Sequence, residues 1–482
     1  MDNREEFLRR AGAILGDRGL VTDPELLAPW LTDWRGRYTG KAMAMAQPSA
    51  TQEVSALVAL CAEFRVPIVP QGGNSGMSGG ATPDESGDSL LLSMRRMDRF
   101  RAFDPAQRQI TCEAGVVLQT LHEKVREQGL RFPLTLGGKG SATIGGLVST
   151  NAGGTQVLRH GTMGAQVLGL EVVLADGSVL DGTSPLKKDN RGFDPNRLFI
   201  GSEGTLGIVT AVTLALIPDI AERRVVWAGL DDIKAARRLL VAFQDKADAY
   251  LEGFEVVPQH SLEAVLDYLP NARNPLDAIH PWSVLVELVG GEDDGEMLQD
   301  LAEAVLGEAF EDGLIQDATI AANESQAEDL WLLRESIAPA ERGVGPAVQH
   351  DVSVPVARMA DFIDEAVPAV EKQFPGTRGV AFGHLGDGNV HFHVRAPAGA
   401  EARTWEDGEG KAASAFVHDL VTQWDGSISA EHGIGQIKVD ELARLTDPAR
   451  LSLLGNVKRA LDPQNLLNPG KLLALAPQGP TD

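Results

Sequence analysis

The chain of 482 residues is long enough for two or three domains with substantial cores. Apolar residues make up 43% and charged residues 23%, which is typical of soluble globular proteins and excludes a disordered or fibrous chain. No apolar run reaches the roughly 18 residues that a membrane helix requires, and the start, MDNREEFLRR, lacks the apolar core of a secretion signal. We therefore expect a cytoplasmic protein without a membrane span.

The net charge is −25, from 43 basic and 68 acidic residues. A field of this sign repels phosphate backbones and anionic membrane surfaces, so we expect no nucleic-acid partner. The two cysteines, Cys61 and Cys112, are too few for a thiolate zinc cluster or a disulfide framework.

The first half of the chain alternates short strands and helices. Periodicity predicts a helix over 51–64 with Thr51 as its N-cap, a hairpin over 169–182 with Asp176-Gly177 at its turn, and a strand over 208–218 ended by proline. Further elements in this half are strands over 66–70, 88–93 and 109–114 and a helix over 117–128. The main boundary is expected near residue 218.

After residue 218 a strand–helix–strand–strand–helix pattern over 224–307 is followed by a similar one over 357–424, which suggests a duplicated α+β unit. The end of the chain is helical and punctuated by proline. We predict three segments, namely an N-terminal helix with a first domain over 1–218, an α+β domain over 219–425 and a helical C-terminal segment over 426–482.

Three glycine-rich runs stand out, namely PQGGNSGMSGG at 70–80, LGGKGSATIGGLVSTNAGG at 136–154 and GSEGTLGIVT at 201–210. One such run indicates tight turns, whereas several together let backbone N–H groups converge on an anion such as a pyrophosphate. The sequence has no P-loop pattern and no Rossmann G-x-G-x-x-G between a strand and a helix. The runs therefore predict a dinucleotide site of another type.

The sharpest chemical signal is GHLGDGNVHFH at 383–393. On a strand that starts at Asn389, His391 and His393 point to one face, and the Gly-Asp-Gly turn could fold His384 back beside His391. Forty residues later AEHGIG supplies Glu431 and His432. His384, His391 and Glu431 would form a two-histidine, one-carboxylate site suited to zinc or another divalent transition metal. Such histidines can instead serve only as hydrogen-bonding core residues.

These motifs resemble, in order, those of flavoproteins of the vanillyl-alcohol-oxidase / p-cresol-methylhydroxylase (PCMH) type. PQGGNSGMSGG, GGLVSTNAGG, GLEVVLADGSVL, KKDNRGFD and GSEGTLGI carry the resemblance, which covers about residues 35 to 475. The match is nearest to the D-2-hydroxyacid dehydrogenase branch. It implies an α+β fold with a bipartite PCMH-type FAD-binding domain, a substrate domain with an antiparallel sheet, and a helical C-terminal segment that returns to the FAD.

The resemblance also implies which residues bind FAD. The first run would wrap the pyrophosphate, the second would follow the ribityl chain and adenosine, Glu203 and Ile208 would lie near the adenine and ribose, and Asn468 would close over the flavin. The implied residues of the first two runs are Pro70, Gly72, Gly73, Asn74, Ser75, Gly76, Met77, Gly140, Ser141, Ile144, Gly145, Gly146, Asn151 and Gly153. Some members of the family attach FAD covalently through a histidine in the first run. Residues 70–80 contain no histidine, so the resemblance implies non-covalent FAD.

The same resemblance implies the catalytic roles. His384, His391 and Glu431 would be the metal ligands, His432 the general base, and Arg334 in WLLRES the clamp for the substrate carboxylate. The 2-hydroxyglutarate enzymes of the family often have lysine where this chain has Gln349. They also often have a hydroxyl residue where it has Ala338 and asparagine where it has His393. Gln349 and His393 are expected substrate contacts, and the three differences weaken the case for that particular substrate.

The resulting prediction is metal-assisted oxidation of a D-2-hydroxy acid to the 2-oxo acid, with hydride transfer to flavin N5. Electron-transfer flavoprotein or a quinone would reoxidise the flavin, and family members are often homodimers. Two alternatives stay open. One is an FAD oxidase of a related alcohol or hydroxy acid that uses oxygen, and the other is a metal-dependent hydrolase whose glycine runs are only turns.

Overall fold

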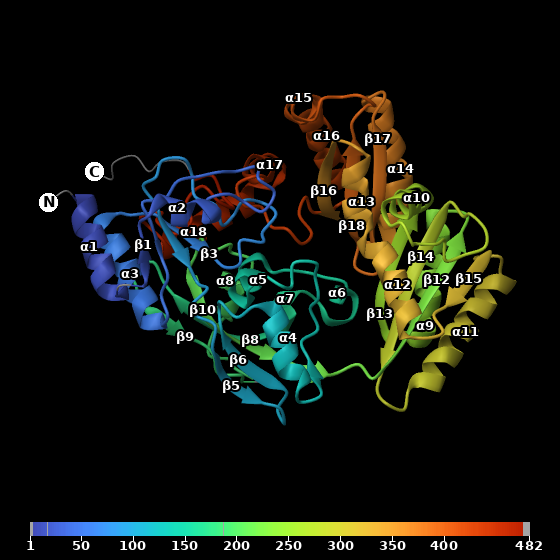
Figure 1. Ribbon diagram of the computed structural model, residues 1–482, viewed down its shortest axis with the longest axis horizontal. Coiled ribbons are helices and arrows are strands. Elements are labelled where there is room, and N and C mark those ends of the chain that lie inside the picture. The colour runs from blue at the N-terminus through green and yellow to red at the C-terminus, as the bar shows by residue number, and fades with distance from the viewer. Residues whose placement is uncertain (1–2, 17, 187, 476–482) are drawn as a thin grey trace. The chain divides into compact units, whose positions relative to one another are not determined.

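The computed structural model describes residues 3–16, 18–186 and 188–475 (Figure 1). The chain divides into unit 1, which comprises 1–154, 160–218 and 431–482, and unit 2, which comprises 155–159 and 219–430. Lys187 of KKDNRGFD and the outermost ends of the first and last predicted segments lie outside the described residues. The domain limits at 218 and 425 stay predictions. No helix in the described part of the chain is long and apolar enough to cross a membrane.

Two sheets frame unit 1. One has the order β1-β2-β4-β3, with β2, β4 and β3 parallel, and the other has the antiparallel order β5-β6-β10-β8-β9. The strands of unit 1 are β1 Leu20–Val21, β2 Ala44–Ala46, β3 Ile68–Gln71, β4 Leu90–Ser93, β5 Phe100–Asp104, β6 Gln109–Glu113, β7 Leu130–Arg131, β8 Val167–Val173, β9 Val179–Asp181, β10 Ile208–Ala215 and β11 Ile217–Pro218. The predicted hairpin is present, because β8 pairs with β9 and Gly177 adopts a φ of 85° in the turn.

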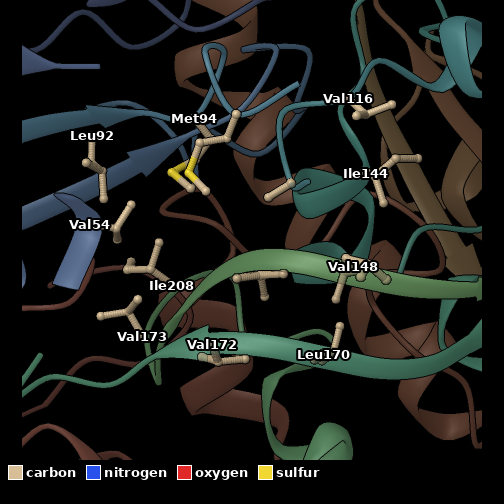
Figure 2. Close-up of a cluster of buried hydrophobic side chains, with 14 of the residues drawn as sticks. Val54, Leu92, Met94, Val116, Ile144, Val148, Leu170, Val172, Val173 and Ile208 are labelled. Carbon is tan, nitrogen blue, oxygen red and sulfur yellow. The ribbon is translucent and has the colours of Figure 1, made fainter. Parts of the chain in front are cut away.

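Helices pack on these sheets around a large apolar core, and Leu27 of α2 joins a separate, smaller apolar cluster. They are α1 Asn3–Leu15, α2 Pro24–Leu27, α3 Thr51–Phe64, α4 Leu118–Arg126, α5 Ile144–Thr150, α7 Met163–Gln166, α8 Asn196–Phe199, α17 Val439–Leu445 and α18 Pro448–Leu461. Figure 2 shows part of this core, where Val54 of α3, Leu92 of β4 and Ile208 of β10 lie near one another. Burial of such side chains is the main favourable contribution to folding.

The C-terminal segment belongs to unit 1. Val457 and Leu461 of α18 pack against the core of unit 1, and the chain after the helix pairs with the start of β3. Ile68 donates its N–H to Leu466 and accepts from Asn468. Residues 466–468 thus form an isolated bridge to β3, the edge strand of a sheet built from the first hundred residues of the chain.

The prediction of Thr51 as N-cap is wrong. Ala50 is the capping residue and Thr51 is the first residue of α3. The Thr51 hydroxyl donates instead to Glu171 across the unit, at 2.5 Å. A tertiary partner has displaced the local capping bond.

Unit 2 is built on one seven-stranded antiparallel sheet with the order β15-β12-β14-β13-β17-β18-β16 (Figure 1). Its strands are β12 Glu222–Leu230, β13 Leu251–Pro258, β14 Trp282–Gly290, β15 Asp317–Ile320, β16 Ala347–Ser353, β17 Arg378–His384 and β18 Asn389–Arg395. The strands β12, β13 and β14 form one set of three, and β16, β17 and β18 form another. In each set the third strand lies between the first and the second. This arrangement agrees with the predicted duplication.

The two faces of this sheet differ. Helices α9 Ile233–Ala247, α11 Gly295–Glu311, α14 Met359–Gln373 and α16 Glu409–Gln423 bury the larger apolar cluster with residues such as Phe254 and Phe392. On the other face, α10 Gln259–Tyr268, α12 Glu324–Glu335 and α13 Ile337–Val344 pack against Trp227 and Phe382. Two shorter helices are α15 Ala402–Asp407 and α6 Val157–His160. Because side chains alternate along a strand, the histidines of β18 fall on the second face.

Candidate functional site

The first two glycine runs meet in unit 1. A Cβ atom on Gly73 would lie 1.7 Å from the carbonyl oxygen of Ser141, and one on Gly72 would lie 2.2 Å from the hydroxyl of Thr143. No other residue type fits at such approaches. Asn74, with a φ of 54°, turns the loop there, and its side chain donates to the Thr32 carbonyl. The two runs therefore form one surface made largely of backbone.

The third run joins the same surface. A Cβ on Gly204 would lie 2.5 Å from Pro70, and the N–H of Glu203 donates to the Ser149 carbonyl at the end of α5. Asn468 donates its side-chain N–H groups to the carbonyls of Gly80 and Glu203. All three runs and the C-terminal segment thus come together, as the sequence predicted.

Two buried polar atoms on this surface have no partner among the described residues. They are the hydroxyl oxygen of Thr143 and the side-chain oxygen Oδ1 of Asn468. Buried polar atoms normally have a hydrogen-bond partner. A bound polar molecule with phosphate, hydroxyl or amide groups would supply one, so this part of unit 1 fits FAD.

The predicted cofactor residues do not all present side chains to a ligand. Ile144 and Ile208 are almost fully buried in the core, and Figure 2 shows both among apolar neighbours. Asn151 uses its side-chain oxygen to accept from Thr162 and from the N–H of Gly164. Only the backbone of the two isoleucines could reach a cofactor. The remaining predicted residues lie on the same loops or on α5, namely Ser75, Gly76, Met77, Gly140, Gly145, Gly146 and Gly153.

Glu203 has its carboxylate committed within unit 1. The two oxygens accept from the N–H groups of Ile434 and Gly435, each at 2.7 Å. Burial raises the pKa of Glu203, while these two N–H donors oppose the shift. Glu203 was predicted near the adenine and ribose, but its carboxylate faces the loop that follows His432.

The histidine face of unit 2 places His384 and His391 side by side. His384 ends β17, the turn reverses the chain, and the Nε2 atoms of the two rings lie 3.3 Å apart. The folding back that the Gly-Asp-Gly turn predicted is confirmed. Burial, and then the charges of His384 and Arg334, hold the pKa of His391 well below its usual range. His391 is therefore neutral, the form that binds metals.

Each of these rings has a carboxylate at its other nitrogen. His384 Nδ1 lies 2.6 Å from Glu255, and His391 Nδ1 lies 3.8 Å from Asp351. Metal-binding histidines almost always direct the second ring nitrogen at a carboxylate, carbonyl or water, which fixes the tautomer. With Nδ1 directed at carboxylates, both Nε2 atoms point at one place. This donor set fits a divalent metal.

Arg334 is buried rather than solvated. It extends from α12, is 7% exposed, and places Nε and Nη2 at 2.9 and 2.8 Å from one oxygen of Glu255. Its guanidinium also lies 5.3 Å from the ring centre of Phe382. Burial alone would raise the pKa of Glu255, but His384 and Arg334 hold it down to about 2. Arg334, Glu255 and His384 thus form one charged chain.

Three residues of this face were not identified from the sequence. Glu255 and Glu252 are two carboxylates on the otherwise apolar strand β13, and acidic residues on such a strand were the available signal. Asp351 lies on β16, a strand that was not predicted, and accepts from Asn389 at 2.8 Å. Phe382 packs its ring against both His391 and His393, with ring centres 5.1 and 5.2 Å away.

The predicted substrate contacts lie on the same face. Gln349 is the cross-strand partner of His393, so the two side chains emerge together, one step along the sheet from Asp351 and His391. Ala338, on α13, packs against the cluster of that face.

Glu431 and His432 belong to unit 1, directly after the last residue of unit 2. Ala430, the residue before Glu431, donates its N–H to the Asp351 carbonyl at 3.2 Å. On the other side, the hydroxyl of Ser78 lies 3.1 Å from the carbonyl oxygens of His432 and Gly433. Each of these contacts lies within its own unit.

Two family models match the chain. Residues 42–183 match an FAD binding domain, and residues 220–472 match the C-terminal domain of FAD linked oxidases. Together they span both units and show that the cofactor is FAD.

Curated relatives cover nearly the whole chain. A probable mitochondrial D-2-hydroxyglutarate dehydrogenase of Oryza sativa subsp. indica is 38% identical over 465 residues, which are 96% of this chain and 80% of the relative. A D-2-hydroxyglutarate dehydrogenase of Xanthomonas citri pv. viticola is 36% identical over 457 residues, or 94% of each chain. Among solved structures, p-cresol methylhydroxylase has a TM-score of 0.75 at 18% identity, covering 97% of this chain and 96% of that one, which supports the fold.

The chain belongs to the FAD-linked D-2-hydroxyacid dehydrogenase branch of the PCMH-type flavoproteins. It is an oxidoreductase, and the predicted family, α+β fold and FAD are confirmed. These matches favour an oxidoreductase over the metal-dependent hydrolase that the residues alone had left open.

Proposed function

We propose that the chain oxidises D-2-hydroxyglutarate to the 2-oxo acid, with non-covalent FAD and a divalent metal, zinc being the first to test. The relatives' names supply the substrate. The observation that carries the metal is the pair of imidazoles, His384 and His391, whose Nε2 atoms face each other with carboxylates at both Nδ1 atoms.

His384 and His391 would hold the metal, with Glu431 as the third ligand by resemblance to the family. A divalent metal, when bound, supplies a Lewis acid that lowers the pKa of the substrate hydroxyl. Glu255, 2.6 Å from Nδ1 of His384, and Asp351, 3.8 Å from Nδ1 of His391, would favour the tautomer in which Nε2 carries the lone pair that a metal needs. FAD, when bound, supplies the hydride acceptor at N5.

Arg334 would orient the substrate through its C1 carboxylate. Nε donates to Glu255, whereas Nη2, although 2.8 Å from the same oxygen, makes no hydrogen bond to the described residues, so the donors of Nη2 would serve a second carboxylate. Clamping by a buried arginine fixes which face of C2 is presented. His432 would accept the proton of the hydroxyl, because an imidazole titrates near neutral pH.

His393 and Gln349 are the candidates for the distal carboxylate of the substrate. They emerge side by side beyond His391, on the face that carries the other proposed groups. Electrons would leave the flavin to an electron-transfer flavoprotein or a quinone. An oxidase reaction with oxygen is the alternative within the same family.

The test is an anaerobic absorbance spectrum of the purified protein, followed by D- and L-2-hydroxyglutarate, D-lactate and other 2-hydroxy acids. Bleaching near 450 nm by D-2-hydroxyglutarate, and its loss after treatment with a chelator, is expected. A flavin that no hydroxy acid bleaches would overturn the substrate. Hydrogen peroxide formed in air at the rate of turnover would favour the oxidase.

A further inference from the structure

Glu203 lies in unit 1 in an unusual backbone position. Its φ is 52°, in the left-handed region that few residues other than glycine adopt, and it is 9% exposed. Its N–H and C=O are bonded to Ser149 and Asn468, so the main chain is fixed before the side chain begins. A strained backbone conformation of this kind persists only where the surrounding structure holds it in place, and such positions are often found at functional sites.

The carboxylate of Glu203 is hydrogen-bonded to the loop that carries His432. Its two oxygens accept from consecutive N–H groups, those of Ile434 and Gly435. Gly433, with a φ of 76°, would place a Cβ 2.9 Å from the same carboxylate. Charge-assisted bonds to backbone N–H groups are about twice as strong as neutral ones.

The loop is also fixed from the first glycine run. A Cβ on Gly435 would lie 2.0 Å from the Ser78 carbonyl oxygen, which accepts from the N–H of Gln436. The side chain of Gln436 donates to the Gly79 carbonyl. The segment after His432 is therefore locked between the first and third glycine runs.

We propose that Glu203 is a positioning residue, which orients His432 by holding the N–H groups of Ile434 and Gly435 in the loop that follows it. This inference rests on the proposed function, in which His432 accepts the substrate proton. It assigns to the GSEGTLG run a task besides cofactor binding, since the carboxylate is directed at the loop. Glutamine would offer one acceptor and would set an N–H donor against the second N–H.

The experiment compares Glu203→Gln and Glu203→Asp with the unaltered holoenzyme. Each is purified with FAD and reduced anaerobically by D-2-hydroxyglutarate in single-turnover mixing, or by whichever 2-hydroxy acid bleaches the flavin. We expect E203Q to lower the reduction rate by roughly 10- to 100-fold, the range expected when a reacting group is displaced by about 1 Å. KM and the FAD content should change by less than about twofold, and E203D should recover part of the rate.

Two further measurements separate a positioning role from a merely structural one. Hydrogen exchange at the amides of Ile434 and Gly435 should be slow in the unaltered protein and faster in E203Q. In a His432→Ala background, E203Q should cause no additional loss of rate. Glu113→Gln is the control, because Glu113 is another buried carboxylate of unit 1, which pairs with Arg99 and Arg101 rather than with a loop backbone. It should alter thermal stability without this pattern.

Loss of FAD from E203Q at an unchanged reduction rate per bound flavin would overturn the proposal in favour of a cofactor contact. Fast exchange at Ile434 and Gly435 in the unaltered protein would also overturn it, even if E203Q did not fold. If His432→Ala remained fully active, the base assignment itself would fail. The exchange data on E203Q would then still report whether Glu203 holds the loop.

Discussion

The glycine-lined surface of unit 1 and the histidine face of unit 2 are built on opposite principles. In unit 1 the surface is backbone, and its shape depends on atoms that are absent, such as the Cβ that would strike Ser141 from residue 73. In unit 2 the face is side chain, and it depends on the opposite charges of Arg334 and Glu255, with His384 hydrogen-bonded to the same carboxylate. Adding an atom should therefore damage the first, and removing a charge should damage the second.

The largest expected effect is on the charged chain. Glu255→Ala should lower the free energy of unfolding of unit 2 by about 3–5 kcal/mol, because it leaves the buried guanidinium of Arg334 without its carboxylate. Calorimetric unfolding measures this effect. Glu324→Ala, which removes an exposed partner of Arg223, is the control and should change stability by less than about 1 kcal/mol. Equal stabilities of the two variants would contradict the comparison.

Gly73→Ala tests the opposite principle. The added methyl group must displace the Ser141 backbone, so we expect a cost of about 1–3 kcal/mol in unit 1 and a protein purified with little FAD. The measurement is the ratio of absorbance at 450 nm to that at 280 nm. Gly137→Ala is the matched control, since nothing lies within 4 Å of its added Cβ. Full flavin content in Gly73→Ala would show that the runs do not shape the FAD site.

Asp351→Asn should weaken metal binding without changing the flavin content. Loss of the carboxylate beside His391 is expected to weaken metal binding or activity by roughly 10- to 100-fold. Metal content after dialysis is measured by mass spectrometry, with the flavin spectrum as internal control. Undiminished metal would remove Asp351 from the proposed site.

The smallest expected effect sharpens the comparison furthest. Gly76→Ala adds a Cβ that meets nothing within 4 Å, at an exposed position, so stability should change by no more than about 1 kcal/mol. If the backbone there approaches the pyrophosphate, FAD should nevertheless bind less tightly. Flavin release followed by fluorescence decides the point, and unchanged affinity would place the pyrophosphate elsewhere.

The sequence predicted the parts of each site that depend on local chain geometry. Alternation on β18 was enough to place His391 and His393 on one face, and the Gly-Asp-Gly turn was enough to bring His384 back. The sequence could not predict that Glu255 belongs to the site, because Glu255 lies opposite His384 only through the pairing of two strands, and these residues are 129 positions apart. Thr51 failed as a cap for the same reason, since its hydroxyl has a partner on β8. Long-range pairing overrode the local preference in both cases.

The division of the chain determines the order in which its two units can be completed during synthesis on the ribosome. Unit 2 lies almost entirely within 219–430, whereas unit 1 lacks residues 466–468 beside β3 until the chain has been synthesised well beyond unit 2. At about 5–20 residues per second, the 212 residues of that insertion take roughly 10–40 s to translate. During this interval the N-terminal half exposes an unpaired strand edge at β3, and the FAD surface is complete only after residues 466–468 have emerged. A cell under heat stress should therefore lose nascent chains arrested before residue 466 to chaperones or proteases more readily than finished ones.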